Sequence, residues 1–437
     1  MKDKETKKKF TANHSLSEGS AKAFFFLRHN NDIDHITPVL HKWLSTENIP
    51  TDVIITTKRD FLDDYRINLL KKFKNARIFF LNDMFKKFSA THLFNLVYFK
   101  YTTQLDSLFY KIPIFRKIAN KIIRHIANQI FKDESKGIVV FDWITTYFVK
   151  QMVKIAKERG FITVSLPHGD APYVNYMIAN NDFNYRCLDQ YKYSNIFDYV
   201  IVPNDLFYKR FENYLQKNRI KVFGSPRYCD EWVDIISKFI TPFDIDGSDE
   251  KLKIVFFLRS TGFPIFWEEV IRTIKLIMQF PEIYLVVKNH PRSSQSRRLE
   301  REIIRVYPDI RQKFDKNLKF IYGEHSSSSL INWADIMLDL GTSVTWEAVK
   351  QKKPVIMPDY LHANYSTISF YFKESEIKCR DQLYDTLQKF MQNKNLVFYN
   401  ENERKRFIEK VIDVPDKHVL ERYCKFLKSC FKRIRIN

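Results

Sequence analysis

The sequence predicts an α/β protein whose sheets are parallel and buried on both faces, and two observations carry this prediction. Short apolar segments alternate with amphipathic, helix-like segments along most of the 437 residues, which is typical of parallel sheets covered by helices. Within residues 334–359, an apolar strand, a tight turn, a helix and a second apolar strand follow one another directly. This order describes a βαβ unit, whose two strands run parallel.

The predicted strands form two series, and each series predicts one α/β domain. Strands of the first series are expected at residues 23–27, 53–56, 77–81, 138–141, 162–166, 199–202 and 221–223. Those of the second series are expected at residues 254–258, 284–287, 319–321, 336–338 and 355–357. Amphipathic segments between the strands, such as residues 32–44 and 146–159, predict the covering helices.

Changes in composition set the predicted domain limits. Residues 1–20 are polar and basic, so we expect a flexible tail there. Residues 240–251 combine proline, glycine and acidic side chains and form the predicted linker. One domain is therefore expected at residues 21–239 and the other at residues 252–410.

Two segments, at about residues 84–131 and at residues 411–437, are predicted to be helical, with the first inserted in the N-terminal domain. Both combine aromatic and aliphatic side chains with many lysines and arginines. Such a helix either packs its apolar face against the protein body or lies on a membrane surface. The sequence leaves both alternatives open.

The net charge of +21 requires an explanation in terms of a partner. Nucleic acid, an anionic membrane surface and a polyanionic substrate are candidates, and a biased genome composition is a further source of lysine. No helix-turn-helix, RNP or zinc-finger pattern is evident, so we expect no nucleic-acid partner.

No apolar stretch approaches the roughly 18 residues of a membrane span, and no apolar region follows the basic N-terminus, as a secretory signal would require. The five scattered cysteines predict a reducing compartment, hence the cytoplasm, without disulfides or zinc.

Four of the nine glycines follow predicted strands in polar loops, at positions 169, 224, 262 and 341. A chain that uses so few glycines needs them there for a positive φ or for a close approach of the backbone to a ligand. Ligands of open α/β sheets bind at the carboxyl ends of the strands. These loops are therefore the predicted site.

The loop after residues 162–166 carries His168 and Asp170. A histidine there can accept a proton from an attacking hydroxyl, or it can cap the next helix or bond to the backbone. Arg227, in the second loop, is expected to bind a phosphate or to pair with Asp230. On the loop after the first predicted strand, His29, Asp32 and His35 would face the acceptor, and His35 or Asp32 could take the proton instead of His168.

The loops of the second domain are the predicted donor site. Phosphate-binding side chains and backbone groups are expected at Arg259, Ser260, Thr261, Gly262, Lys288, His290 and Arg292. Gly341, Thr342 and Ser343 open a helix and predict an anion site with free backbone N–H groups. Glu347, one turn into that helix, could receive ribose hydroxyls.

The order of the loop motifs resembles that of the CDP-glycerol glycerophosphotransferases of teichoic-acid synthesis and of related capsule and surface-polysaccharide transferases. The resemblance covers roughly residues 160–360. The motifs are HG at 168–169, GxPR at 224–227, KxHP at 288–291, D-x-x-[ST]-S at 339–343 and KPVI at 353–356. It implies a GT-B fold, in which two Rossmann-like, doubly wound domains face each other across a cleft and the C-terminal one binds the nucleotide donor. By position, it implies that His168 is the base and that His290, Arg227, Thr342 and Ser343 contact the donor.

Our leading hypothesis is therefore a metal-independent transferase without a cofactor. It would move a sugar or polyol phosphate from a nucleotide-activated donor to the hydroxyl of a glycan or lipid-linked acceptor, in capsule, teichoic-acid-like or lipopolysaccharide synthesis. The basic helices would hold it on the anionic inner leaflet of the cell membrane. The alternatives are a sugar-nucleotide 2-epimerase of the same fold and a non-catalytic basic scaffold that binds membranes or polyanions.

Overall fold

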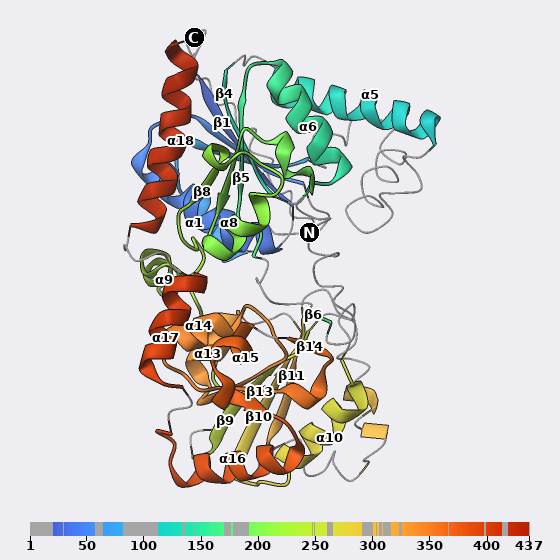
Figure 1. Ribbon diagram of the computed structural model, residues 1–437, viewed down its shortest axis with the longest axis vertical. Coiled ribbons are helices and arrows are strands. Elements are labelled where there is room, and N and C mark those ends of the chain that lie inside the picture. Colours follow the sequence, from blue (N-terminus) through green and yellow to red (C-terminus); the bar gives the residue numbers. More distant parts are fainter. Residues whose placement is uncertain are drawn as a thin grey trace, which may run out of the picture.

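A computed structural model gives the fold of the chain (Figure 1). It describes residues 21–28, 30–56, 64–81, 112–132, 136–143, 145–169, 176–177, 192–246, 248, 250–259, 265–290, 300–302, 304–305, 308, 316–322, 326–365, 367–396, 399–412 and 418–436. Two α/β domains lie one above the other in Figure 1, and each has a parallel sheet with helices on both faces. The helices of the part described include none that is long and apolar enough to cross a membrane.

The first domain is built on a seven-stranded sheet with the order β3-β2-β1-β4-β5-β7-β8. Its strands are β1 (Lys22–Leu27), β2 (Thr51–Ile55), β3 (Ala76–Phe80), β4 (Gly137–Asp142), β5 (Ile162–Leu166), β7 (Tyr199–Val202) and β8 (Ile220–Val222). Its helices are α1 (Asn30–Thr46), α2 (Tyr65–Leu70), α5 (Pro113–Ile130), α6 (Tyr147–Glu158), α8 (Asp205–Phe211) and α9 (Asp230–Ser237). The strand order reverses between β1 and β4, which makes the sheet doubly wound and places a binding crevice at that point.

The second domain is built on a six-stranded sheet with the order β11-β10-β9-β12-β13-β15. Its strands are β9 (Leu252–Phe257), β10 (Ile283–Lys288), β11 (Leu318–Ile321), β12 (Ile336–Asp339), β13 (Val355–Pro358) and β15 (Glu376–Ile377). Its helices are α10 (Trp267–Ile277), α13 (Ser327–Trp333), α14 (Thr345–Lys350), α15 (Thr367–Tyr371), α16 (Arg380–Gln392) and α17 (Glu401–Phe407). The reversal lies between β9 and β12, so the segment predicted as a βαβ unit supplies β12, α14 and β13 next to the crevice.

Each predicted strand of both series is present, with ends that differ by about one or two residues, which is the usual scatter of element ends. The α/β fold class with doubly wound sheets is therefore confirmed. A short antiparallel pair of strands, β6 (Tyr176–Met177) and β14 (Asn364–Tyr365), was not predicted, and it joins a loop of the first domain to one of the second.

The helix α18 (Val419–Ile436) returns to the first domain and lies beside it in Figure 1. Its apolar side chains, among them Leu420, Tyr423 and Leu427, are buried in the same core as α1. The hydroxyl of Tyr423 donates to Gly224 O at 2.9 Å. The apolar face of α18 therefore packs against the protein body, which is one of the two predicted alternatives for the C-terminal segment.

Helix α5 is the described part of the predicted helical insertion. It buries Ile123, Ile126 and Ile130 against the first sheet, and its outer face is exposed. The rest of the insertion, up to residue 111, lies outside the described residues, as does the predicted tail 1–20.

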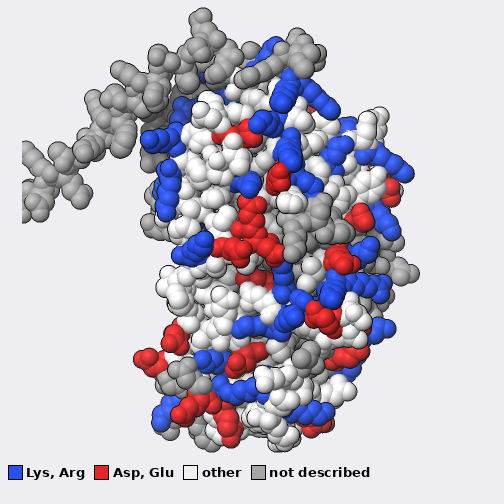
Figure 2. Space-filling model, turned by 90° about the vertical axis from the view of Figure 1, so that its left-hand side faces the viewer, with Lys and Arg blue, Asp and Glu red and all other residues white. Residues whose placement is uncertain are grey.

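Figure 2 shows the face that carries α18, α9 and α17. Lys and Arg spread over much of this face, while Asp and Glu gather midway along it, where the two domains meet. Helix α9, which lies at that level in Figure 1, begins with Asp230 and Glu231. The excess of positive charge is therefore interrupted by an acidic zone on this side of the molecule.

Candidate functional site

Four charged side chains meet at the carboxyl ends of β1, β4 and β5. Arg28 directly follows β1, Asp32 lies in the first turn of α1, Asp142 ends β4 and His168 follows β5. The guanidinium of Arg28 donates to both oxygens of Asp142, and its backbone N–H donates to Asp32 Oδ2 at 2.8 Å. All four side chains are buried, and we call these residues the charge cluster. They lie at the point where the strand order of the first sheet reverses.

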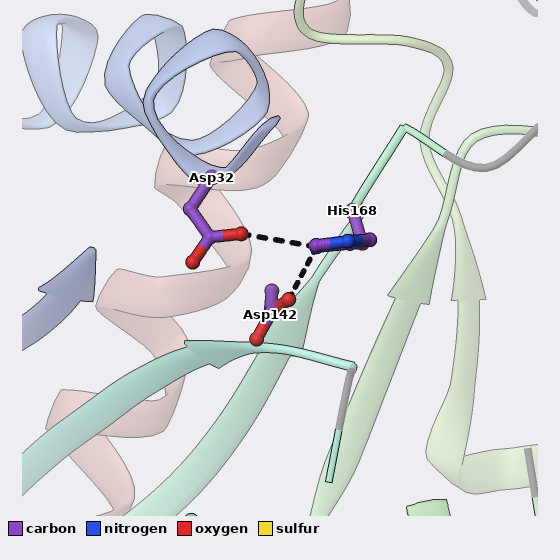
Figure 3. A group of neighbouring side chains, drawn as sticks. All are labelled: Asp32, Asp142 and His168. Carbon is purple, nitrogen blue, oxygen red and sulfur yellow. Dashed lines mark hydrogen bonds and ion pairs between the residues drawn. The ribbon is translucent and has the colours of Figure 1, made fainter. Parts of the chain in front are cut away.

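One edge of the imidazole of His168 faces two carboxylates, and both contact the same ring nitrogen (Figure 3). Its Nδ1 donates to Asp32 Oδ1 at 3.0 Å and also to Asp142 Oδ2. Burial alone would lower the pKa of His168, but Asp142 and Asp32 outweigh burial and raise this pKa to about 9. At neutral pH the cluster therefore holds two positive and two negative charges. A bond from His168 to a helix end or to the backbone, the other predicted role, stays a prediction.

Asp32, Asp142 and His168 also each offer one ligand atom, and these atoms lie within 4.8 Å of one another, as in a metal site. The donor set nevertheless fits a metal ion poorly. The guanidinium of Arg28 already pairs with both oxygens of Asp142, which a metal ion would have to displace. The cluster is better suited to hold and move protons than to bind a cation.

His35 lies on α1, close to the loop that follows His168. Its side chain is only 4% exposed, and its Nδ1 has no hydrogen-bond partner among the described residues. Gly169 adopts a φ of +84°, and a Cβ added there would lie 2.2 Å from His35 Nε2. Gly169 thus meets the first predicted reason for a glycine, a positive φ, and it also leaves room for the imidazole of His35. Gly224 and Gly341 also have a positive φ, as predicted, and Gly262 lies outside the described residues.

Arg227 pairs with Asp34 Oδ2 at 3.0 Å rather than with Asp230. The other oxygen of Asp34 pairs with Arg66. Asp34 therefore outweighs burial and raises the pKa of Arg227, which stays charged. Asp230 instead pairs with Lys350 of the second domain at 2.7 Å. The predicted Arg227–Asp230 pair is wrong, and the predicted phosphate contact stays a prediction.

The residue after Arg227 joins the two domains. The hydroxyl of Tyr228 donates to Ser343 O at 2.6 Å, and Lys350 Nζ donates to Tyr228 O. On the second domain, the acceptor Ser343 lies in the loop after β12, and the donor Lys350 lies at the end of α14. A narrow gap lies next to this contact. Its lining includes His35, Gly169 and Tyr228 from the first domain and Ser343 and Trp346 from the second.

The turn between β12 and α14, residues 339–343, is fixed by the buried carboxylate of Asp339. Its Oδ1 accepts from the backbone N–H and from the hydroxyl of Thr342, each at 2.8 Å. Burial raises the pKa of Asp339. Arg259, which follows β9, donates to Gly341 O. The predicted donor residues Arg259, Gly341, Thr342 and Ser343 are thus brought together where the second sheet reverses its strand order. The prediction of free backbone N–H groups is wrong for Thr342, because its N–H donates to Asp339.

Glu347 is buried in α14, 7% exposed. Its Oε2 accepts from the hydroxyl of Ser328 at 3.0 Å. Burial raises the pKa of Glu347, although Ser328 and the charge of Arg227 act in the opposite direction. The carboxylate lies within one turn of Ser343, as predicted, and it is already held in place by a neighbouring helix.

The remaining predicted residues divide into two groups. Lys288 is buried at the end of β10, a strand that pairs with β9. His290 follows two residues later and is half-buried. Five predicted positions lie outside the described residues, together with Gly262. They are His29, Asp170, Ser260, Thr261 and Arg292.

The sequence did not single out Arg28, Asp142, Asp34 or Tyr228. Arg28 and Asp142 each stand directly at a strand end, and they meet only because β1 and β4 are neighbours in the sheet. A search for charged residues at the ends of buried strands would have found both. Nothing local in the sequence indicates the contacts of Asp34 and Tyr228, which depend on how the loops fold.

No protein-family model and no curated protein matches the chain. Among solved structures, the chain is similar to S. aureus MnaA in a co-structure with UDP, with 12% identity, a TM-score of 0.56 and coverage of 94% of this chain and 97% of that one. It is also similar to the UDP-GlcNAc 2-epimerase from Neisseria meningitidis bound to UDP-GlcNAc, with 12% identity, a TM-score of 0.52 and coverage of 94% and 100%.

A glycosyltransferase from Rickettsia africae is a third neighbour, with 12% identity, a TM-score of 0.51 and coverage of 96% of this chain and 99% of that one. At these identities the likeness shows the fold alone. These neighbours have the GT-B fold, so the predicted GT-B architecture is confirmed over most of the chain.

Proposed function

We propose that the chain is a GT-B transferase that moves a sugar or polyol phosphate from a nucleotide-activated donor to an acceptor hydroxyl in surface-polysaccharide synthesis. The observation that carries this proposal is the position of the charge cluster. It stands at the switch point of the first sheet, and its chain neighbours Trp143, Pro167 and Gly169 line the narrow gap whose other wall includes Ser343 of the second domain. Proton chemistry on one side and an anion-binding turn on the other are what such a transfer requires.

On the donor side, the 339–343 turn and Arg259 would receive the phosphates of the nucleotide. Arg259 is already fixed by its bond to Gly341 O, so a phosphate bound at this turn would meet a positioned guanidinium. Lys288 and His290 would add charge from the end of β10. Glu347 would accept the ribose hydroxyls, which suits a carboxylate held near the same turn.

On the acceptor side, the charge cluster supplies a buried imidazolium. His168 has a pKa of about 9, so it is a hydrogen-bond donor at neutral pH, and it would orient an acceptor oxygen or stabilise charge on the leaving phosphate. This differs from its predicted role as the base, which a protonated ring cannot perform.

A 2-epimerase that acts on a UDP-linked sugar is the second candidate. Two of the named neighbours support it, since one is a UDP-GlcNAc 2-epimerase bound to its sugar nucleotide and another binds UDP. A specific observation also favours it, because Asp32 and Asp142 form a buried pair of carboxylates close to His168. Such groups could remove and return a proton on a sugar carbon.

We also propose that α5 holds the protein on an anionic membrane surface, as a lipid-linked acceptor would require. The helix contains no acidic residue, and Lys117 and Lys121 are exposed on its outer face. At its start, Ile112 is 45% exposed and Ile114 is 62% exposed. An amphipathic helix of this kind combines attraction to anionic lipids with shallow insertion of apolar side chains. The double variant K117E/K121E should lose binding to phosphatidylglycerol vesicles and keep its melting temperature.

The test of the main proposal starts from thermal stabilisation by UDP-, CDP-, CMP- and GDP-linked compounds. The stabilising donor is then incubated with and without acceptor in D₂O. Consumption only when an acceptor is present supports the transferase. Deuterium incorporation at the sugar carbon without any acceptor supports the epimerase instead. If none of the compounds stabilises the protein, a nucleotide-dependent function is wrong.

A further inference from the structure

Two histidines lie side by side at the proposed acceptor side, and they have opposite surroundings. The Nδ1 of His168 contacts Asp32 and Asp142, and their carboxylates favour the protonated ring. His35 faces the positive charges of Arg227 and of His168 itself, and only Asp32 acts in the opposite direction. Its other close neighbours are Gly169 and the ring of Tyr228, which stands edge-on to the imidazole with the ring centroids 6.3 Å apart.

His35 lies next to the narrow gap between the two domains, which has a volume of about 10 Å³ in this conformation and must widen before a substrate hydroxyl can reach the ring. Its Nε2 lies beside Gly169, and both residues line the gap between the two domains. Nδ1 has no hydrogen-bond partner among the described residues, although unpaired buried polar atoms are rare in folded proteins. The ring is therefore fixed by packing, while neither nitrogen is tied to a carboxylate.

We propose that His35 accepts the proton of the acceptor hydroxyl and that His168 remains protonated beside it. This assignment rests on the proposed transfer function and names the proton acceptor for it. Asp32 is a poorer candidate, because its oxygens already accept from the backbone of Arg28 and from His168.

The titration of the two rings agrees with this assignment. Burial, followed by the charges of Arg227 and His168, lowers the pKa of His35 well below its usual 6.5. The pKa of His168 is raised to about 9. Over the pH range between these values, one ring is neutral and the other is charged. Groups whose pKa values are pushed apart in this way are the usual base and acid of a site.

The step balances without any further reactant. The acceptor oxygen forms a bond to the anomeric carbon or to the phosphorus of the donor, and its proton moves to the neutral His35. The bond from that centre to the phosphate oxygen of the nucleotide breaks, and the electron pair leaves with the nucleotide. The imidazolium of His168 donates a hydrogen bond throughout and keeps its proton. His35 then releases its proton to water.

The first test needs no substrate. Nitrogen-edited NMR of the imidazole rings in the free protein, assigned with the variants His35→Gln and His168→Gln, should show a neutral His35 at pH 6.5 and a charged His168 at pH 8. A charged His35 at pH 6.5 would overturn the assignment. This result is independent of the identity of the donor.

The second test uses the donor found by thermal stabilisation. The wild-type kcat/KM should rise with pH as His35 loses its proton and fall near pH 9 as His168 does. H35Q should lower kcat about 100- to 10,000-fold and remove the acidic limb, with unchanged stabilisation by the donor. H168Q should remove the basic limb. An acidic limb that persists in H35Q would overturn the proposal.

His41 provides a matched control. It lies two turns further along α1, its pKa is also lowered by burial, and its ring contacts Phe73 and Trp232 rather than the site. His41→Gln should therefore leave both limbs in place. Absence of turnover with every donor that binds would overturn the proposed function and would leave the NMR result to decide the state of His35.

Discussion

The two sheets place very different groups at their switch points. In the first domain, Arg28, Asp32, Asp142 and His168 are buried and pair with one another. In the second domain, backbone groups and the hydroxyl of Thr342 line a turn, and one arginine is fixed beside it. A mutually paired ion cluster keeps protons in defined places, while in the second domain the N–H and hydroxyl of Thr342 are bonded to Asp339 and the guanidinium of Arg259 stands beside the turn. Both domains have a doubly wound parallel sheet, and the residues at the strand ends distinguish the two switch points.

The largest expected effect comes from breaking the paired cluster. Asp142→Asn leaves Arg28 and His168 with one carboxylate for two buried charges, which should cost roughly 3–5 kcal/mol of folding stability. It should also lower the pKa of His168, because Asp142 is the stronger of its two partners. Denaturant unfolding and NMR titration of His168 measure both effects. The exposed Asp230→Asn is the control, and equal losses from the two variants would show that the cluster has no special role.

Raising the pH should remove the positive charge of His168 from the same cluster without a mutation. The folded-state pKa of His168, about 9, is higher than its unfolded value of about 6.5. The contribution of His168 to the free energy of unfolding is therefore fully present below pH 6.5 and is lost as pH rises through about 9. A shift of this size corresponds to about 3 kcal/mol. Unfolding free energies measured between pH 6.5 and 9 should fall in the wild type and in His41→Gln. A flat profile over this range would contradict the raised pKa.

The second domain should respond in binding more than in folding. Arg259→Ala removes a guanidinium from the 339–343 turn, and loss of one charge-assisted hydrogen bond to phosphate should weaken nucleotide binding by about 1.5–3 kcal/mol, roughly 10- to 100-fold. Calorimetric titration with the stabilising nucleotide checks this. Arg272→Ala, at an exposed arginine of α10 that pairs with Glu268 and Glu269, is the control. Equal affinities in both variants would place the phosphates elsewhere.

The smallest effect concerns the contact between the cluster loop and His35. Gly169→Ala and Gly160→Ala introduce the same strain, because both glycines have a φ near +84°, and each should cost about 1–3 kcal/mol. Only the methyl group at position 169 meets His35 Nε2. G169A should therefore be the less stable variant and should displace the ring signals of His35 in NMR spectra. Identical behaviour of the two variants would mean that His35 is free to move aside.

The strands could be predicted because each is a short apolar run bounded by turn residues, and parallel strands buried on both faces need little more than that. His168 and the 339–343 turn followed from one rule, that ligands meet strand ends. The pairing of Arg28 with Asp142 was not predicted, because the two residues lie 114 positions apart in the sequence and only the order of the strands brings them together. For α18, periodicity identified the apolar face but could not identify the surface that it covers.

The return of α18 also has a consequence for biosynthesis. Its side chains complete the core that contains α1, yet the ribosome makes this helix after the whole second domain. At about 5–20 residues per second, the apolar surface of α1 waits on the order of ten seconds or longer for its cover. During that time the first half of the nascent chain is a natural client for chaperones, and a truncation before α18 would leave it in that state permanently.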